Sequence, residues 1–151
     1  MMASSLLMPR ERVSELLSEV GWTARSVQTI AKSFDVSFEA AARRYIKVNP
    51  RQCAMMILDR SRDGRMKPTQ RPVLSDALEG RSIELVAPPY GQESSISRAF
   101  SETGMVVSPE KVVLSRGRGR SRKSDIFVGN VESIGRGFRN NRRVYSFISL
   151  P

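Results

Sequence analysis

Three segments in the first fifty residues repeat one hydrophobic spacing, and this repeat limits the possible folds more than any other feature of the chain. Apolar side chains recur at relative positions 0, 3, 4 and 7 in segments that begin at Val13, Val27 and Phe38. This spacing places four side chains on one face of an α-helix. The sequence therefore predicts three amphipathic helices, over residues 9–21, 24–34 and 37–47.

Residues that start and stop helices flank these segments. Pro9 suits a first helical turn, where its missing N–H is not needed, and Gly21 is expected to end that helix. Thr23 and Ser37 are expected to cap the second and third helices, because a hydroxyl oxygen can accept a hydrogen bond from a free N–H of the first turn. Three amphipathic helices with a very short link before Ser37 predict a tri-helical bundle over residues 1–50.

The segment from Ser26 to Val48 has the layout of a helix-turn-helix unit. Such turns often carry glycine, and this chain has Asp35, which can adopt a left-handed conformation. The outward face of the last helix would present cations that could reach DNA phosphates, namely Arg43, Arg44 and Lys47. The alternative is that these three side chains form an ordinary solvated helix face.

Three stretches of the chain resemble the ImmA/IrrE family of metallo-endopeptidases: Ala3-Ser4-Ser5-Leu6-Leu7-Met8-Pro9, Ile30 to Ser37 and Ala40 to Tyr45. In that family, an HExxH helix is followed by a helix that supplies a glutamate ligand and ends in Leu-Leu-Met-Pro. A helix-turn-helix-like unit comes next. The match covers residues 3 to about 48, and no position in it matches a catalytic residue of the family.

The resemblance implies that this chain corresponds to the non-catalytic C-terminal part of such a protein, with the zinc region upstream of Met1. The implied function is regulation or interaction linked to transcription, because intact members cleave a repressor. The implied partner is a transcription regulator or the upstream peptidase region. A truncation, a natural short form and a reading frame assigned a late start all remain open.

The chain contains no histidine and one cysteine, Cys53. These counts exclude an HExxH zinc site, a Ser-His-Asp triad and a Cys-His dyad within the chain, together with a closed zinc site of nitrogen and sulfur ligands. The sequence also lacks a Gly-rich phosphate loop. We therefore expect no cofactor in this chain and no enzymatic activity.

After Pro50 the hydrophobic period becomes that of strands. Strands are predicted at 54–58, 83–86, 111–115, 125–128 and 143–150, with turns at 62–65 and 140–141 and one helix between Ser94 and Gly104. This order predicts an α+β domain over residues 51–151 with a mostly antiparallel sheet. The family resemblance implies that this domain is GAF-like.

A ligand pocket in this second domain would draw on apolar side chains. The candidates to line it are Met55, Met56, Phe127, Tyr145 and Phe147. The alternative is that these five residues form ordinary core, which is where such side chains most often lie.

The chain carries a formal net charge of +10, from 25 Lys and Arg against 15 Asp and Glu, which makes nucleic acid a plausible partner. Five cations fall within eight positions, at Arg116, Arg118, Arg120, Arg122 and Lys123. We expect a mobile hairpin tip that tracks phosphates, extended by Arg142 and Arg143. The alternatives are a free-standing DNA-binding protein that uses Arg43, Arg44 and Lys47 together with this loop and a solvated loop without a partner.

No apolar run approaches the roughly 20 residues that a membrane span needs, and the N-terminal residues do not form a signal peptide. The expected location is the cytoplasm, without a membrane partner.

Overall fold

The computed structural model describes residues 7–63, 65–85, 94–116, 119–137 and 142–151. Its helices and antiparallel strands confirm the predicted α+β class. The predicted turn at 140–141 and Arg118 lie outside the described residues, as does Gly64 of the turn predicted at 62–65.

The N-terminal third contains the three expected helices, α2 (Arg10–Val20), α3 (Ser26–Phe34) and α4 (Phe38–Val48). Pro9 precedes α2, and Gly21 follows it with a φ of 100°, a conformation that suits glycine. The predicted cap of the second helix is not made, because the Thr23 hydroxyl lies 3.2 Å from that of Ser26 and α3 begins without a side-chain cap.

The turn between α3 and α4 has the expected geometry. Asp35 adopts the left-handed conformation, with φ 52° and ψ 51°, and its N–H donates to carbonyl oxygens at the end of α3. Ser37 caps α4 by accepting from the N–H of Ala40 at 3.1 Å. Whether this unit acts as a helix-turn-helix in DNA recognition remains a prediction.

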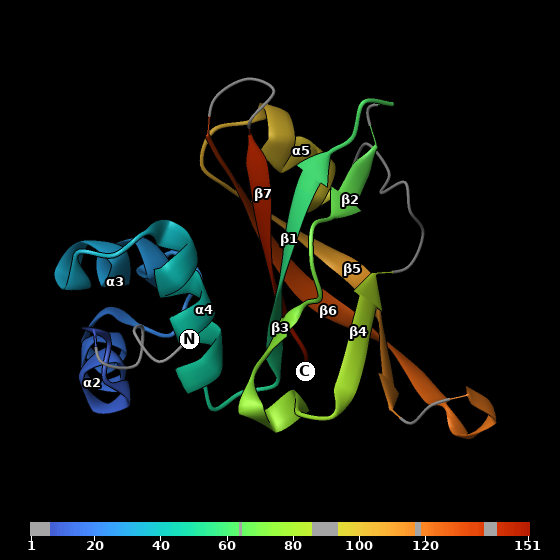
Figure 1. The fold of residues 1–151 in the computed structure, drawn as a ribbon, viewed down its shortest axis with the longest axis horizontal. Helices are drawn as coiled ribbons and strands as arrows, with labels where there is room; N and C mark the ends of the chain where they lie inside the picture. The colour runs from blue at the N-terminus through green and yellow to red at the C-terminus, as the bar shows by residue number, and fades with distance from the viewer. Residues whose placement is uncertain (1–6, 64, 86–93, 117–118, 138–141) are drawn as a thin grey trace.

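Residues after Asn49 form strands and three short helices. These elements are β1 (Cys53–Arg60), β2 (Met66–Pro68), β3 (Val73–Leu74), a 3-10 turn η1 (Asp76–Leu78), β4 (Arg81–Leu85), α5 (Ser95–Ser101), β5 (Met105–Arg116), η2 (Gly119–Ser121), β6 (Lys123–Arg136) and β7 (Arg143–Ser149). Within the described residues, seven strands form one antiparallel sheet in the order β2-β1-β7-β6-β5-β4, with β3 also paired to β1. The sheet curls, and β4 is seen to the right of β1 and β3, with β5 and β6 behind (Figure 1).

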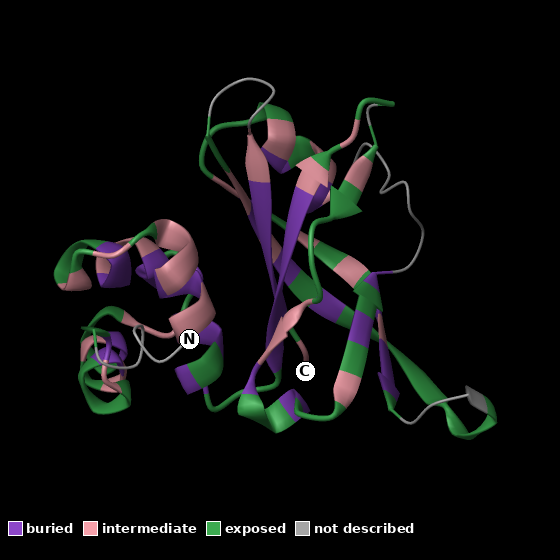
Figure 2. Ribbon diagram, viewed as in Figure 1, coloured by how far each residue is buried: buried purple, intermediate pink, exposed green. Residues whose placement is uncertain are grey.

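The sheet separates two hydrophobic clusters, and β1 is buried on both faces (Figure 2). Met55 and Ile57 belong to the helix-side cluster, which also contains buried residues of α2, α3 and α4. Met56 and Leu58 belong to the α5-side cluster. The boundary predicted at residue 50 is where helix gives way to strand, and the helix-side cluster continues across it.

Helix α4 joins the bundle to the sheet. It contacts α2 and α3 as well as β1 and β3. Phe38 packs edge-on against Tyr145, and Tyr45 packs edge-on against Phe147, with ring centroids 5.1 and 6.0 Å apart. Met55, Tyr145 and Phe147, which were candidates for a ligand pocket, therefore lie in this cluster.

Helix α5 covers the other face of the sheet and buries a chain of hydroxyl groups. The Ser95 hydroxyl oxygen lies 2.9 Å from that of Ser133, which lies 2.8 Å from that of Ser146. The Glu110 carboxylate accepts from the N–H and the hydroxyl of Ser95. These contacts satisfy polar groups that would otherwise destabilise an apolar cluster.

Burial of Cys53 predicts a loss of stability at high pH. Desolvation raises the pKa of this thiol to about 11, although Ser75 and Arg51 oppose the rise. Folding therefore favours the thiol over the thiolate. The stabilisation that results is complete below about pH 8.5 and is lost as the pH rises towards 11. We expect the free energy of unfolding in urea to fall over this range by up to about 2 kcal/mol more in the wild type than in Cys53→Ala. Equal slopes of the unfolding free energy against pH in the two proteins would contradict this expectation. Tyr45 and Tyr145 titrate in both proteins, so they do not contribute to the difference.

Candidate nucleic-acid interface

Strands β5 and β6 form a long hairpin that extends away from the helical bundle (Figure 1). The predicted strands at 111–115 and 125–128 are parts of it, and both observed strands are longer than expected. Pairing continues to Arg116 and Lys123, which lie opposite each other. The two end residues of the predicted loop are therefore held on strands.

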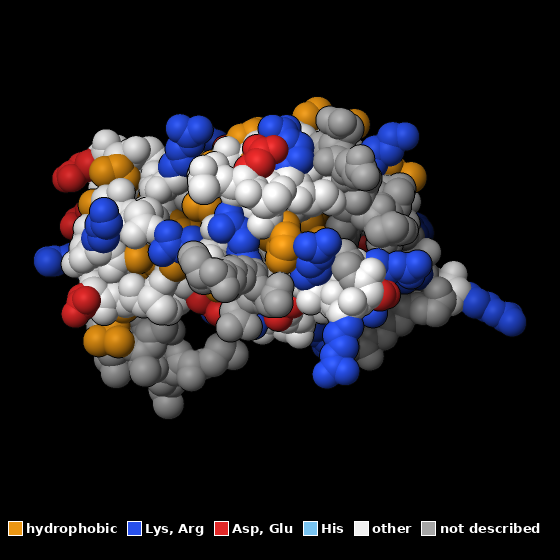
Figure 3. All heavy atoms as spheres, turned by 90° about the horizontal axis from the view of Figure 1, so that it is seen from above, with side chains coloured by type: hydrophobic (Ala, Val, Ile, Leu, Met, Phe, Trp, Pro, Cys, Tyr) orange, Lys and Arg blue, Asp and Glu red, His pale blue; other side chains and the backbone are white. Residues whose placement is uncertain are grey.

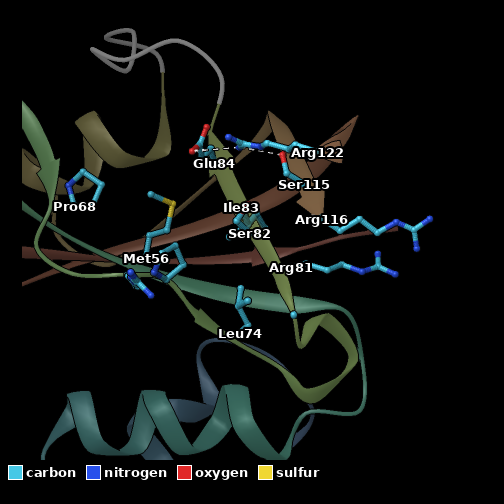
Figure 4. Close-up of a pocket in the computed structure, with 13 residues that line it drawn as sticks. Met56, Pro68, Leu74, Arg81, Ser82, Ile83, Glu84, Ser115, Arg116 and Arg122 are labelled. Atoms are coloured by element: carbon cyan, nitrogen blue, oxygen red, sulfur yellow. Dashed lines mark hydrogen bonds and ion pairs between the residues drawn. The ribbon is translucent and has the colours of Figure 1, made fainter. Parts of the chain in front are cut away.

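Three cations lie side by side on neighbouring strands at this end of the sheet. Arg81 of β4 is opposite Arg116, and Arg116 is opposite Lys123. Ile83 and Leu114, each two residues away, are buried in the α5-side cluster, so alternation along the strands places these cations on that face. Figure 4 shows Arg81 and Arg116 extending in the same direction.

This cation row is electrostatically unfavourable in the isolated protein. Adjacent strands are about 4.7–4.9 Å apart, and like charges directly opposite each other destabilise a sheet. No salt bridge within the described part of the chain joins any of the three to a carboxylate. An anionic ligand that lay across the row would relieve this repulsion.

Arg122 lies beside the row and is held by its neighbours. Its Nη2 atom donates to the Ser115 hydroxyl at 3.1 Å and lies 3.7 Å from Oε1 of Glu84. The Ser115 and Ser124 hydroxyl oxygens are 2.7 Å apart across the hairpin. Arg120 is exposed in η2. We define the hairpin cation surface as Arg81, Arg116, Arg120, Arg122 and Lys123.

The molecule seen from above has Lys and Arg side chains over the end formed by the hairpin, with few acidic side chains among them (Figure 3). The surface is therefore locally cationic, in addition to the net charge of +10 for the whole chain. Such a surface attracts polyanions over about a Debye length, which is roughly 8–10 Å at moderate salt.

A groove of about 1010 Å³ borders the hairpin cation surface and runs along β4 (Figure 4). Its apolar lining comes from Met56, Pro68, Pro72, Leu74 and Ile83. Its cationic lining comes from Arg71, Arg81, Arg116 and Arg122. We call this feature the β4 groove. Met56 is thus the one residue among the five predicted pocket candidates that lines it.

The predicted cations of α4 are arranged differently. Arg43 forms a salt bridge with Glu39 at 3.0 Å, and Nε of Arg44 donates to the Met8 carbonyl oxygen at 2.8 Å. Lys47 is exposed. Partial burial opposes the effect, but Arg43, Tyr145 and Arg143 together lower the pKa of Glu39 below its ordinary value. Two of the three α4 cations therefore already have partners inside the protein.

Arg142 and Arg143 lie at the opposite end of β6 from the hairpin tip, where Arg143 pairs with Arg136, and they also have internal partners. Arg142 donates to the Ala99 carbonyl oxygen at 3.2 Å and thus binds the last turn of α5. Arg143 bonds to Asp59 at 3.0 Å and forms an ion pair with Glu39 at 3.4 Å. Binding of nucleic acid by these two residues remains a prediction, and it would compete with these contacts.

Sequence reasoning missed Arg71 and Arg81. Arg81 carries no local signal, because its place beside Arg116 depends on the register between β4 and β5. Arg71 follows Thr69 and Gln70 between the two short strands β2 and β3, neither of which was predicted. For Arg71, the only indication in the sequence was that a basic residue stands shortly before a strand.

The described residues contain neither a metal-ligand cluster nor a helix suited to a membrane. Among them, no three His, Cys, Asp or Glu side chains gather closely enough to hold a metal ion. None of the described helices combines the length and the apolar character that crossing a bilayer requires. Comparison with known proteins gave no matching family model and no matching curated protein.

Proposed function

We propose that this chain is a recognition module without catalytic activity that binds the phosphates of duplex DNA through the hairpin cation surface. The observation that carries the proposal is the row of Arg81, Arg116 and Lys123, which lies across three strands without a carboxylate partner among the described residues. Cations that contact phosphates position a protein on DNA without reading its bases. Binding is therefore expected to be independent of sequence.

The hairpin is favoured over α4 as the DNA-binding element. Helix α4 lies between α2 and α3 and the sheet, and its aromatic side chains pack on β7. A recognition helix needs a free face to enter the major groove. Arg43 and Arg44 would also have to leave Glu39 and the Met8 carbonyl group to reach phosphates.

The proposal is tested by titrating a fluorescein-labelled duplex with the protein and measuring fluorescence anisotropy. Phosphate contacts by the five cations of the hairpin cation surface predict a slope of log K against log salt of roughly −4.5, or a loss of affinity of roughly five-hundredfold between about 50 and 200 mM salt. Two unrelated duplex sequences should bind equally. Absence of binding at the lower salt concentration would contradict the proposal.

Replacing Glu84 by glutamine is expected to strengthen DNA binding. Glu84 is the carboxylate nearest to Arg122, at 3.7 Å, and both side chains are largely exposed. An exposed ion pair of this kind is worth about 0.2–1 kcal/mol, so its removal should raise affinity roughly 1.5- to 5-fold and leave the unfolding free energy within about 0.5 kcal/mol. Glu79→Gln, an exposed substitution with the same charge change outside the groove, is the control. Equal gains in the two variants would mean that Arg122 is not a contact.

A second proposal follows from the ImmA/IrrE resemblance: the chain is the regulatory portion of such a protein and binds a transcription regulator. The observation that favours a protein partner is the β4 groove, which runs along a strand edge and has apolar side chains beneath its arginines. Apolar and cationic groups together suit a polypeptide better than a bare phosphate backbone. The experiment that tests this proposal is the peptide titration described below.

A further inference from the structure

We propose that the β4 groove binds an extended acidic segment of a partner protein, which adds a strand to the free edge of β4. This inference rests on the second proposed function, binding of a protein partner, and its test is separate from that of DNA binding, although Arg81, Arg116 and Arg122 belong to both surfaces. It assigns a partner chemistry to a surface where a strand edge, an apolar floor and several arginines meet (Figure 4).

Strand β4 is at the end of the sheet order. It pairs with β5 over Arg81 to Leu85, and no other strand of the described residues pairs with it. In an antiparallel ladder, alternate residues direct their N–H and C=O groups away from the paired neighbour. The outer edge of β4 therefore presents a row of backbone groups, and such an edge readily accepts another strand.

The floor of the groove suits the side chains of an added strand. Met56 and Ile83 are almost fully buried beneath it, and Leu74 is partly buried. Side chains of an extended peptide alternate between its two faces, so every second side chain would contact this floor. The floor therefore selects a segment with apolar residues at alternate positions.

The charges of the groove favour an acidic segment. Four arginines line it against one carboxylate, Glu84, which is paired with Arg122. Arg71 is exposed, and no ion pair engages it within the described residues. Nucleic acid is the weaker candidate for the groove itself, because no aromatic side chain among its lining residues offers a surface for base stacking.

The first experiment uses a fluorescein-labelled probe peptide, acetyl-Glu-Val-Glu-Val-Glu-Val-Glu-amide, with Gln-Val-Gln-Val-Gln-Val-Gln as the neutral control. We expect the acidic probe to bind and the neutral probe to bind at least about tenfold more weakly, since hydrogen bonds from arginine to a carboxylate are stronger than those to a neutral amide. Equal affinities would show that the arginines do not select the ligand. No binding of either probe would overturn the proposal and leave DNA binding untouched.

Variants separate the groove from the hairpin. Arg71→Gln is expected to weaken the acidic probe about tenfold and to leave DNA affinity within twofold. Arg120→Gln, at an exposed position that does not line the groove, should weaken DNA binding and leave the affinity for the acidic probe within twofold. Both substitutions are at exposed positions, so circular dichroism should show an unchanged fold. If Arg71→Gln has no effect on the peptide, or if both variants lower both affinities equally, the assignment of the groove to a peptide is wrong.

A backbone test shows whether the probe binds as a strand. N-methylation of alternate residues removes the N–H groups along one edge of an extended peptide and leaves the other edge intact. Strand addition to β4 predicts that at least one of the two methylated probes loses binding by tenfold or more, and that amide hydrogen exchange slows over Arg81 to Leu85 when the unmodified probe is bound. Full affinity of both methylated probes, without slower exchange in β4, would contradict strand addition.

Discussion

Replacement of Gly135 by alanine is expected to lower the free energy of unfolding by roughly 3 kcal/mol or more, a loss typical of severe overpacking. Gly135 lies on β6 beneath α5. A Cβ atom at this position would overlap the Ala99 carbonyl oxygen and the guanidinium group of Arg142. The carbonyl group belongs to the backbone of α5 and cannot rotate away, so the helix would have to lift from the sheet.

Urea unfolding followed by far-UV circular dichroism measures this effect. Gly104→Ala is the matched control, because Gly104 has a φ of 84° and nothing within 4 Å of a built Cβ atom. The free energy of unfolding of that variant should fall only by the cost of holding alanine in a left-handed conformation, about 1–2 kcal/mol. If Gly135→Ala is no less stable than Gly104→Ala, α5 does not pack on β6 as described.

The second large effect is expected for the triple variant Arg116→Gln, Arg120→Gln and Lys123→Gln. Each lost phosphate contact should reduce the slope of log K against log salt by about 0.9, which amounts to about 2.7 for three contacts. At about 0.1 M salt, DNA affinity should fall roughly a hundredfold. The three positions are exposed, so the fold should be retained, and the removal of opposed like charges slightly favours the sheet.

A second triple variant controls for net charge. Arg12→Gln, Arg25→Gln and Lys32→Gln remove the same three charges from exposed positions in or beside α2 and α3. If both triple variants lose affinity equally, DNA responds to total charge and not to the hairpin. Lys47→Gln tests the predicted role of α4. A loss of DNA affinity larger than that of Lys123→Gln would indicate that α4, and not the hairpin, is the DNA-binding element.

The helices could be predicted closely because their signals are local. A stripe of apolar residues at positions 0, 3, 4 and 7, with Gly21 after one helix and Ser37 before another, depends on residues at most a few positions apart. The left-handed Asp35 was foreseen for the same reason. The cap at Thr23 was wrong, because its hydroxyl group pairs with that of Ser26, and the second helix begins at Ser26 and not near residue 24.

Five of the strands were located, and four of these five were predicted too short. Residues 123–124 and 129–136 continue β6 although they include Lys123, Asn130 and Glu132, and pairing with β5 and β7 holds them extended. The short strands β2 and β3 exist because they pair with β1, and little in their own sequence indicates a strand. Strand formation depends on neighbours far along the chain, which a local pattern does not contain.

The sequence by itself determined the α+β class, the three N-terminal helices and the abundance of cations between residues 116 and 123, because composition and short-range periodicity depend only on neighbouring residues. Tertiary structure alone decided which cations act together. Register between strands distant in sequence places Arg81 beside Arg116, and packing of α4 and α5 gives Arg44 and Arg142 internal partners. Long-range pairing therefore decides which charges remain available to a ligand.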